Sequence, residues 1–223
     1  MTSSRSGLEK LWKHSFFYAL AAAGFLLSAA IAAGAGYLLW FRCVREVPPP
    51  PDVGPVASAV RNGDIILRSG TGLWSDLFRS RNARDKRFSH VGIVCTGPDG
   101  SCRVLHAEGD DLTGGGTVGY STLEEFVGQS SLIGISRLRA GNPDLLAEYA
   151  ASYAGRPFDW KFDKDDESAV YCTELIALAL RRMNPAYRLP DVSGIIMPEA
   201  CANGEYFAEI PLEKQSATPE GRR

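Results

Sequence analysis

The sequence lacks the features that mark nucleic-acid binding and metal binding. It contains no run of lysine and arginine and no basic stretch interleaved with aromatic residues, and its formal net charge is −2, so we expect no nucleic-acid partner. Its five cysteines form no CxxC pair, and no local zinc-ligand spacing appears. Only three histidines are present, His14, His90 and His106. We therefore expect neither a metal nor a cofactor.

Charge is also missing from a long stretch near the N-terminus. Residues 15–41 read SFFYALAAAGFLLSAAIAAGAGYLLWF, without a charged residue, and this exceeds the roughly 20 residues that cross a bilayer as a helix. Aromatic residues stand at both ends, as at a membrane interface. The small residues of AIAAGAG also suit a cleaved signal peptide, but the apolar run continues beyond them to Phe41. Because the apolar run continues to Phe41, we favour an uncleaved signal anchor. No lipobox precedes Cys43.

The flanking charges and the composition divide the chain into five parts. Three basic residues precede the apolar run and two follow it, which favours a cytoplasmic segment at residues 1–14 and an anchor at 15–41. Prolines 48–51 predict a semi-rigid linker over 42–59. A globular domain over 60–212 and a disordered tail over 213–223 complete the chain. We expect a single-pass protein of the inner (plasma) membrane whose domain is extracytoplasmic.

The globular part contains short strands and helices that are largely segregated along the sequence. Strands are expected in GDIILRS, in LIGISRLR and in the two arms of SHVGIVCTGPDGSCRVLHAEG. Helices are expected in LWSDLFRSRN, in STLEEFVG with Ser121 as N-cap and Glu124 closing a capping box, in PDLLAEYAASYAG, and from Cys172 to about Met183. The glycine-rich segment DDLTGGGTVGY is expected to be a loop. Segregated strands and helices predict an α+β fold with an antiparallel sheet packed on helices.

Cys172 lies where an apolar helix is expected to begin, in the stretch AVYCTELIALAL. Unpaired N–H groups and the helix dipole at that position favour a thiolate. Cysteine is also among the residues most often buried in a core, so a purely structural role stays open.

The turn Gly97-Pro98-Asp99-Gly100 predicts how the two strands around it pair. A three-residue loop closed by Gly97 and Ser101 places Val94 opposite Val104. The same register sets His90 opposite Glu108 and places His90, His106 and Glu108 on one face. It also turns Cys95 and Cys102 away from each other, so we expect no disulfide between them.

Five motifs in this order, GDIIL, SHVGIV, VLHA, GRPFDWKF and YCTELI, resemble the circularly permuted branch of the NlpC/P60 papain-like amidases, the YiiX/YaeF-like group. The resemblance spans about Gly63 to Leu180. It implies a permuted papain-like domain in which the histidine precedes the cysteine, as it does here.

The resemblance also implies roles for particular residues. Cys172 matches the nucleophile and His90 the base, and the mechanism implied is thiolate acyl transfer on an amide of a peptide or N-acyl substrate, such as a cell-wall peptide. His106 falls where many permuted relatives carry a glutamate, and histidine is the third member in many unpermuted relatives. Glu108 is the alternative orienting residue. Tyr171 and Ser89 are candidates for the oxyanion site or the cleft wall.

Three other functions stay open at this level. The same machinery could serve a lipid or protein acyltransferase or thioesterase, and a degenerate member could be a non-catalytic binding module. A zinc hydrolase using His90, His106 and Cys172 is chemically feasible, but no local spacing supports it.

Overall fold

The computed structural model describes residues 3–43, 47–110, 113–163 and 165–212. The chain divides into two compact units, Met1–Glu46 and Val47–Arg223. The described residues of the first unit form the helix α1 (Ser3–Cys43). Within it, Tyr18–Trp40 is long and apolar enough to cross a membrane, and a signal sequence would have the same properties. The predicted tail over 213–223 lies outside the described residues.

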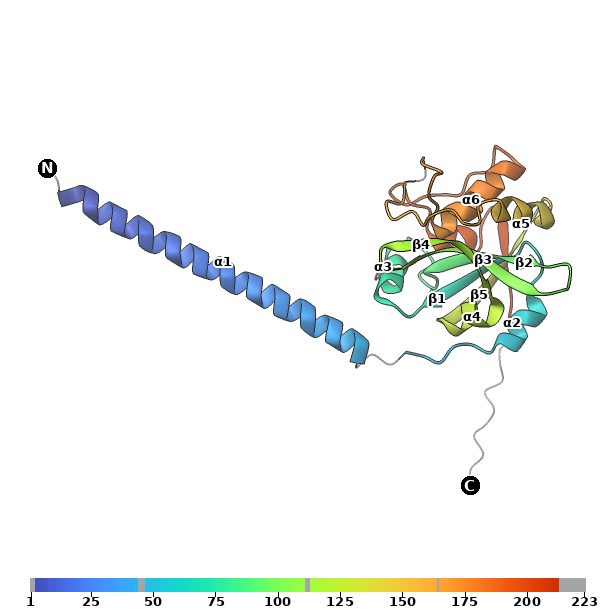
Figure 1. Cartoon of the computed structure of the whole chain (residues 1–223), viewed down its shortest axis with the longest axis horizontal. Coiled ribbons are helices and arrows are strands. Elements are labelled where there is room, and N and C mark those ends of the chain that lie inside the picture. Colours follow the sequence, from blue (N-terminus) through green and yellow to red (C-terminus); the bar gives the residue numbers. More distant parts are fainter. Residues whose placement is uncertain (1–2, 44–46, 111–112, 164, 213–223) are drawn as a thin grey trace, which may run out of the picture. The chain divides into compact units, whose positions relative to one another are not determined.

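The second unit is built on one six-stranded antiparallel sheet in the order β4-β3-β2-β1-β5-β6 (Figure 1). The strands are β1 (Ile65–Gly70), β2 (His90–Thr96), β3 (Cys102–Asp110), β4 (Gly115–Thr122), β5 (Ser130–Leu138) and β6 (Phe207–Ile210). β1 is central, with β2 on one side and β5 on the other. The predicted α+β class with an antiparallel sheet is therefore confirmed.

Helices cover both faces of this sheet. On one face, α5 (Pro143–Ala151), α6 (Cys172–Met183) and the short 3-10 helix η1 (Pro198–Cys201) pack over the larger apolar core. On the other face, α2 (Val53–Ala59) and α4 (Leu123–Gly128) cover a smaller core around Ile66, Val94 and Ile135. A further helix, α3 (Leu73–Arg81), follows β1. Side chains alternate between the two cores along each strand because successive residues of a strand point to opposite faces.

The predicted hairpin has the expected register. Val94 pairs with Val104, Cys95 with Arg103 and Thr96 with Cys102, and Gly100 has the expected left-handed φ of +79°. Cys95 packs against the larger core and Cys102 against the smaller one. Both cysteines are free, so the expectation of no disulfide between them is confirmed.

Four sequence-based expectations about local structure were wrong. The linker does not extend to residue 59, because Val53–Ala59 forms α2 and Val56 is buried in the smaller core. The segment expected to be a glycine-rich loop contains strand β4, which pairs with β3 from Arg103 to Asp110. The N-cap of α4 is Thr122, with Glu125 closing the capping box, one residue later than predicted. Strand β6 was not foreseen.

Candidate active site

Cys172 is the first residue of α6, the most buried helix of the domain. The residues from Thr173 to Leu180 are all buried, and Leu175, Ile176, Ala179 and Leu180 face the larger core as predicted. The helix is held at its start by Glu174, whose Oε2 accepts a hydrogen bond from the Tyr171 N–H at 3.2 Å. Cys172 is partly buried as a residue and lines a pocket of about 200 Å³.

The surroundings of the sulfur combine opposing influences on its pKa. Burial raises the pKa of the Cys172 thiol to about 11, although the backbone N–H groups of Val91 and Thr173 and the Arg68 guanidinium act to lower it. Burial therefore opposes the thiolate that the helix N-terminus favours. The Val91 N–H contact also locates the sulfur, since Val91 directly follows His90.

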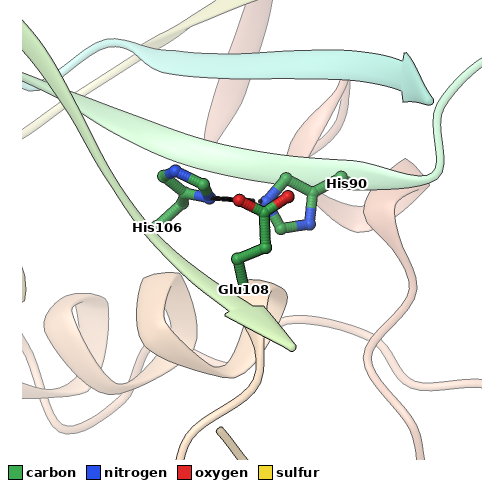
Figure 2. A group of neighbouring side chains, drawn as sticks. All are labelled: His90, His106 and Glu108. Atoms are coloured by element: carbon green, nitrogen blue, oxygen red, sulfur yellow. Dashed lines mark hydrogen bonds and ion pairs between the residues drawn. The ribbon is translucent and has the colours of Figure 1, made fainter. Parts of the chain in front are cut away.

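His90 begins β2 and lines the same pocket as Cys172. Its Nε2 lies 2.9 Å from Nδ1 of His106, and Figure 2 shows the two rings joined through these atoms, with the Glu108 carboxylate beside them. Because Nε2 is engaged by His106, Nδ1 is the ring nitrogen of His90 outside this hydrogen bond. Burial, then Arg68 and His106, hold the pKa of His90 well below its ordinary value.

His106 is buried on β3 and makes the hydrogen bonds expected of an orienting residue. Its Nε2 lies 2.9 Å from the hydroxyl of Ser121, which comes from the neighbouring strand β4. Its Nδ1 lies 3.8 Å from Oε2 of Glu108. Burial lowers the pKa of His106 to about 4, with Glu108 acting to raise it and Arg68 to lower it. Burial thus disfavours the charged imidazolium form of both rings.

Arg68 is a buried residue of this site that the sequence reasoning missed. It lies opposite His90 in the pairing of β1 with β2. Its guanidinium forms an ion pair with Glu108, donates a hydrogen bond to Gln129 Oε1 at 2.8 Å, and stacks over the Phe126 ring at 4.7 Å. In a sequence read alone, an arginine in the strand Ile65–Gly70 carries no signal that distinguishes it from a surface residue. Only the register of β1 against β2 brings it to the histidines.

The other residues predicted for the site have structural hydrogen bonds. Ser89 lines the pocket, but its hydroxyl accepts a hydrogen bond from the Gly70 N–H at 2.9 Å. The Tyr171 hydroxyl accepts one from the Ile196 N–H at 3.1 Å, and Tyr171 is not among the residues lining the pocket. Both residues hold neighbouring backbone in place.

One wall of the pocket is aromatic. Phe162 packs against Phe78 with ring centroids 5.3 Å apart and against Phe158 at 6.1 Å. Trp160 packs on Phe158 at 4.9 Å and donates its indole N–H to the Gly115 carbonyl at 3.0 Å. All four rings line the pocket, together with Trp74. This wall of the pocket therefore presents an apolar surface.

The loop that leads into His90 is fixed by a residue more than one hundred positions away. The Glu199 carboxylate accepts hydrogen bonds from three consecutive backbone N–H groups, those of Ala83, Arg84 and Asp85, at 2.7–2.9 Å. In return, the Asn82 side chain accepts from the Glu199 N–H at 3.3 Å. The segment before the candidate base is thus attached to η1 near the end of the domain.

Within the part of the chain that the structure describes, one group of side chains has the donor atoms and spacing of a metal site. His90, His106 and Glu108 each offer one ligand atom, and these atoms lie within 4.8 Å of one another. Cys172 is not part of this group. The zinc set considered from the sequence, which included Cys172, is therefore not the one that the fold assembles.

The fold is similar to that of a solved structure described as the metalloprotein YiiX from Escherichia coli O157:H7. The two share 19% sequence identity with a TM-score of 0.54, and the similarity covers 69% of this chain and 97% of that one. No protein with a curated description matches the chain.

A sequence comparison agrees with the fold. Residues 59–191 match the family described as permuted papain-like amidase enzymes, YaeF/YiiX, C92. This range contains Arg68, His90, His106, Glu108 and Cys172. Because it is more than half of the 223 residues, the chain belongs to the permuted papain-like amidases of the YaeF/YiiX (C92) family.

Proposed function

We propose that this chain is a cysteine-dependent amidase in which Cys172 is the nucleophile, His90 the general base and His106 the residue that orients His90. The observation that carries the proposal is one pocket lined by Cys172 and His90, with Nε2 of His90 held 2.9 Å from Nδ1 of His106. A nucleophile beside a base that a third group orients is the arrangement needed for covalent acyl transfer.

The tautomers follow from the hydrogen-bond chain. If His106 Nε2–H donates to Ser121, its Nδ1 accepts from His90 Nε2–H, and the lone pair of His90 Nδ1 remains for the thiol of Cys172. Because the thiol and the imidazole are both neutral at rest, the proton moves during attack rather than before it. Arg68, close to both groups, disfavours an imidazolium at His90 and so supports the neutral pair.

The proposed reaction has two stages, acylation of Cys172 and hydrolysis of the resulting thioester. The sulfur forms a bond to the amide carbon while its proton passes to His90 Nδ1, and the carbonyl electron pair moves to oxygen. The C–N bond breaks as His90 gives that proton to the leaving amine, which leaves a thioester on Cys172. Water, losing a proton to His90, attacks this thioester, and the C–S bond breaks as the proton returns to sulfur. Backbone N–H groups at the start of α6 are suited to hold the oxyanion.

The substrate class we propose is a peptide or N-acyl amide with an apolar group next to the scissile bond. The aromatic wall supports this, because it offers rings and no unpaired charge to the ligand. The same wall suits a thioesterase or acyltransferase acting on an acyl chain. Product analysis separates these reactions: an amidase releases the free acid in water, whereas an acyltransferase converts an added amine or alcohol acceptor into its acylated product.

We further propose that α1 anchors the protein in the inner membrane with the catalytic unit outside the cytoplasm. One support is the apolar span Tyr18–Trp40. The other is that three basic residues precede the apolar run and only two follow it, because the more basic flank usually stays in the cytoplasm. The preceding residues are Arg5, Lys10 and Lys13, and the following ones are Arg42 and Arg45. Protease added to spheroplasts should degrade the catalytic unit. Protection of that unit until the membrane is permeabilised would reverse the orientation.

The decisive experiment uses the full-length chain in detergent and a panel of N-acyl amides and peptides. Cys172→Ala should lower turnover by about 10³-fold or more, as removal of a nucleophile does in other acyl-transfer enzymes. Cys95→Ala is the matched control, because that thiol is also partly buried but lies outside the pocket. Turnover by Cys172→Ala equal to that of the unmodified chain would refute the proposed mechanism.

A further inference from the structure

The His90–His106–Glu108 group has the geometry of a three-ligand cation site. The two ring nitrogens that face each other are 2.9 Å apart. Two nitrogens bound to zinc at about 2.0–2.1 Å with a tetrahedral angle would be about 3.3 Å apart, so the rings would need to separate by only about 0.4 Å. The Glu108 Oε2 atom lies 3.8 Å from His106 Nδ1 on the same side.

Two of the three ligands already have the outer partners that metal-binding residues usually have. Ser121 holds the far nitrogen of His106, and Arg68 holds the other oxygen of Glu108. Such partners fix the ring orientation and the direction of the carboxylate. Arg68 is itself fixed by Gln129 and by the Phe126 ring. The cation would therefore enter a site whose ligands are already oriented.

An access route to these ligands is also present. His106 is buried, but the Glu108 side chain is 41% exposed, and both Glu108 and His90 line the pocket. Two imidazoles and one carboxylate are typical ligands of zinc and neighbouring transition metals, whereas calcium and magnesium prefer sites made of oxygen atoms. The Arg68 guanidinium opposes a cation and the carboxylate offsets it, which favours reversible binding.

We propose that His90, His106 and Glu108 form a reversible binding site for a zinc-like divalent cation, and that its occupation switches off the cysteine chemistry. The second half rests on the proposed function. Metal binding requires the lone pair of His90 Nε2, so the proton of that nitrogen must move to Nδ1. A protonated Nδ1 cannot accept the proton of Cys172. Metal binding and catalysis thus require opposite tautomers of one ring.

Calorimetry with zinc chloride on the full-length chain in detergent tests the site itself, whatever the enzyme's substrate. We expect one zinc per chain, no measurable binding of magnesium, and an affinity lowered at least tenfold by Glu108→Gln. Cys172→Ala should bind zinc as the unmodified chain does, because the sulfur is not a ligand of this group. Glu205→Gln is the matched control, an exposed glutamate outside the pocket.

Two results would overturn the site. One is loss of zinc binding in Cys172→Ala, which would place the metal on the cysteine and a histidine. The other is an affinity that does not change in Glu108→Gln or in a second variant, His106→Ala. Glu108 is half-exposed, so its isosteric replacement should fold even if the buried histidine variant does not.

The inhibitory half is tested by alkylation of Cys172 with iodoacetamide in the presence and absence of zinc. Zinc should slow this alkylation at least tenfold in the unmodified chain, and it should have no effect in Glu108→Gln at a zinc concentration that fills only the unmodified site. Equal slowing in both proteins would overturn the inhibition. Zinc binding without any amidase activity would instead leave the site standing and refute the proposed function alone.

Discussion

At the scale of single residues, Glu174 is a buried carboxyl that is only partly satisfied by hydrogen bonds. It is 1% exposed, and its Oε1 atom has no hydrogen-bond partner. Burial raises the pKa of this carboxyl from 4.5 to about 7. A carboxyl whose pKa is higher in the folded than in the unfolded chain stabilises the fold at low pH, and that stability is lost as the pH rises.

We therefore expect the free energy of unfolding to fall as the pH rises from about 4.5 to about 7 through this group, by about 3 kcal/mol if the shift is fully expressed. Glu174→Gln keeps the shape and cannot ionise, so it should flatten this part of the pH profile and be the more stable protein above pH 7. Urea unfolding across that pH range measures the effect. Parallel profiles for the two proteins would contradict it.

Position 92, beside His106, has no space for a side chain. A Cβ atom at position 92 would meet Val104 Cγ1 at 2.5 Å, the Leu105 carbonyl oxygen at 3.1 Å and His106 Cβ at 3.2 Å. Gly92→Ala should destabilise the domain by about 1–3 kcal/mol. Gly119→Ala is the control, because Gly119 pairs with His106 from the other side and its Cβ would meet only Thr117 Oγ1, at 3.9 Å. Denaturation midpoints that are equal for the two variants would contradict this reading.

At the scale of secondary-structure elements, the junction of β4 and α4 separates stability from catalysis in two adjacent residues. Thr122 caps α4, and its hydroxyl accepts from the Glu125 N–H at 3.1 Å. The neighbouring Ser121 instead holds His106. Thr122→Ala should lower the free energy of unfolding by about 1 kcal/mol and leave kcat unchanged. Ser121→Ala should lower kcat about fivefold to tenfold, the equivalent of one hydrogen bond, with little effect on stability.

Both quantities should be measured on both variants, with Ser121→Thr as a partial rescue that retains a hydroxyl. A loss of kcat in proportion to the loss of stability in both variants would show that Ser121 does not act through His106. The pair also shows why a one-residue error in placing a cap matters. The sequence pattern favours Ser121 as the cap, whereas in the fold its hydroxyl contacts His106.

The elements differ in how far their sequences determine them. The turn at residues 97–100 contains a proline and a left-handed glycine, so its geometry fixes the register of β2 and β3 without help from the rest of the fold. Helix α6 is determined by its apolar periodicity. Strand β4 could not be recognised, because its glycines have no strand preference and its pairing depends on β3. Likewise, Arg68 acquires its place only when β1 pairs with β2, which is a long-range contact.

At the scale of the whole molecule, the chain combines a catalytic unit with a helix suited to a bilayer. We expect a charge in the middle of α1 to weaken membrane association. Leu27 lies within the apolar span and is 64% exposed, and an arginine near the centre of a membrane helix costs about 2.5–3.5 kcal/mol. Leu27→Arg combined with Ile31→Arg should therefore release the protein from membranes washed with alkaline carbonate.

Asp99→Arg is the control, since it changes charge in the exposed turn of the catalytic unit. Retention of the double variant in the membrane pellet at the level of this control would argue against a spanning helix. It would leave the proposed chemistry untouched, because that proposal depends only on residues of the second unit.

The hydrogen bonds from the loop before His90 to Glu199 affect when during synthesis the site can form. During synthesis His90 is made first and Cys172 about eighty residues later. Glu199, whose carboxylate holds the loop before His90, is made later still. A nascent or prematurely terminated polypeptide would carry reactive groups that are not yet aligned. On the proposed mechanism, activity would therefore begin only after nearly all of the domain has been made.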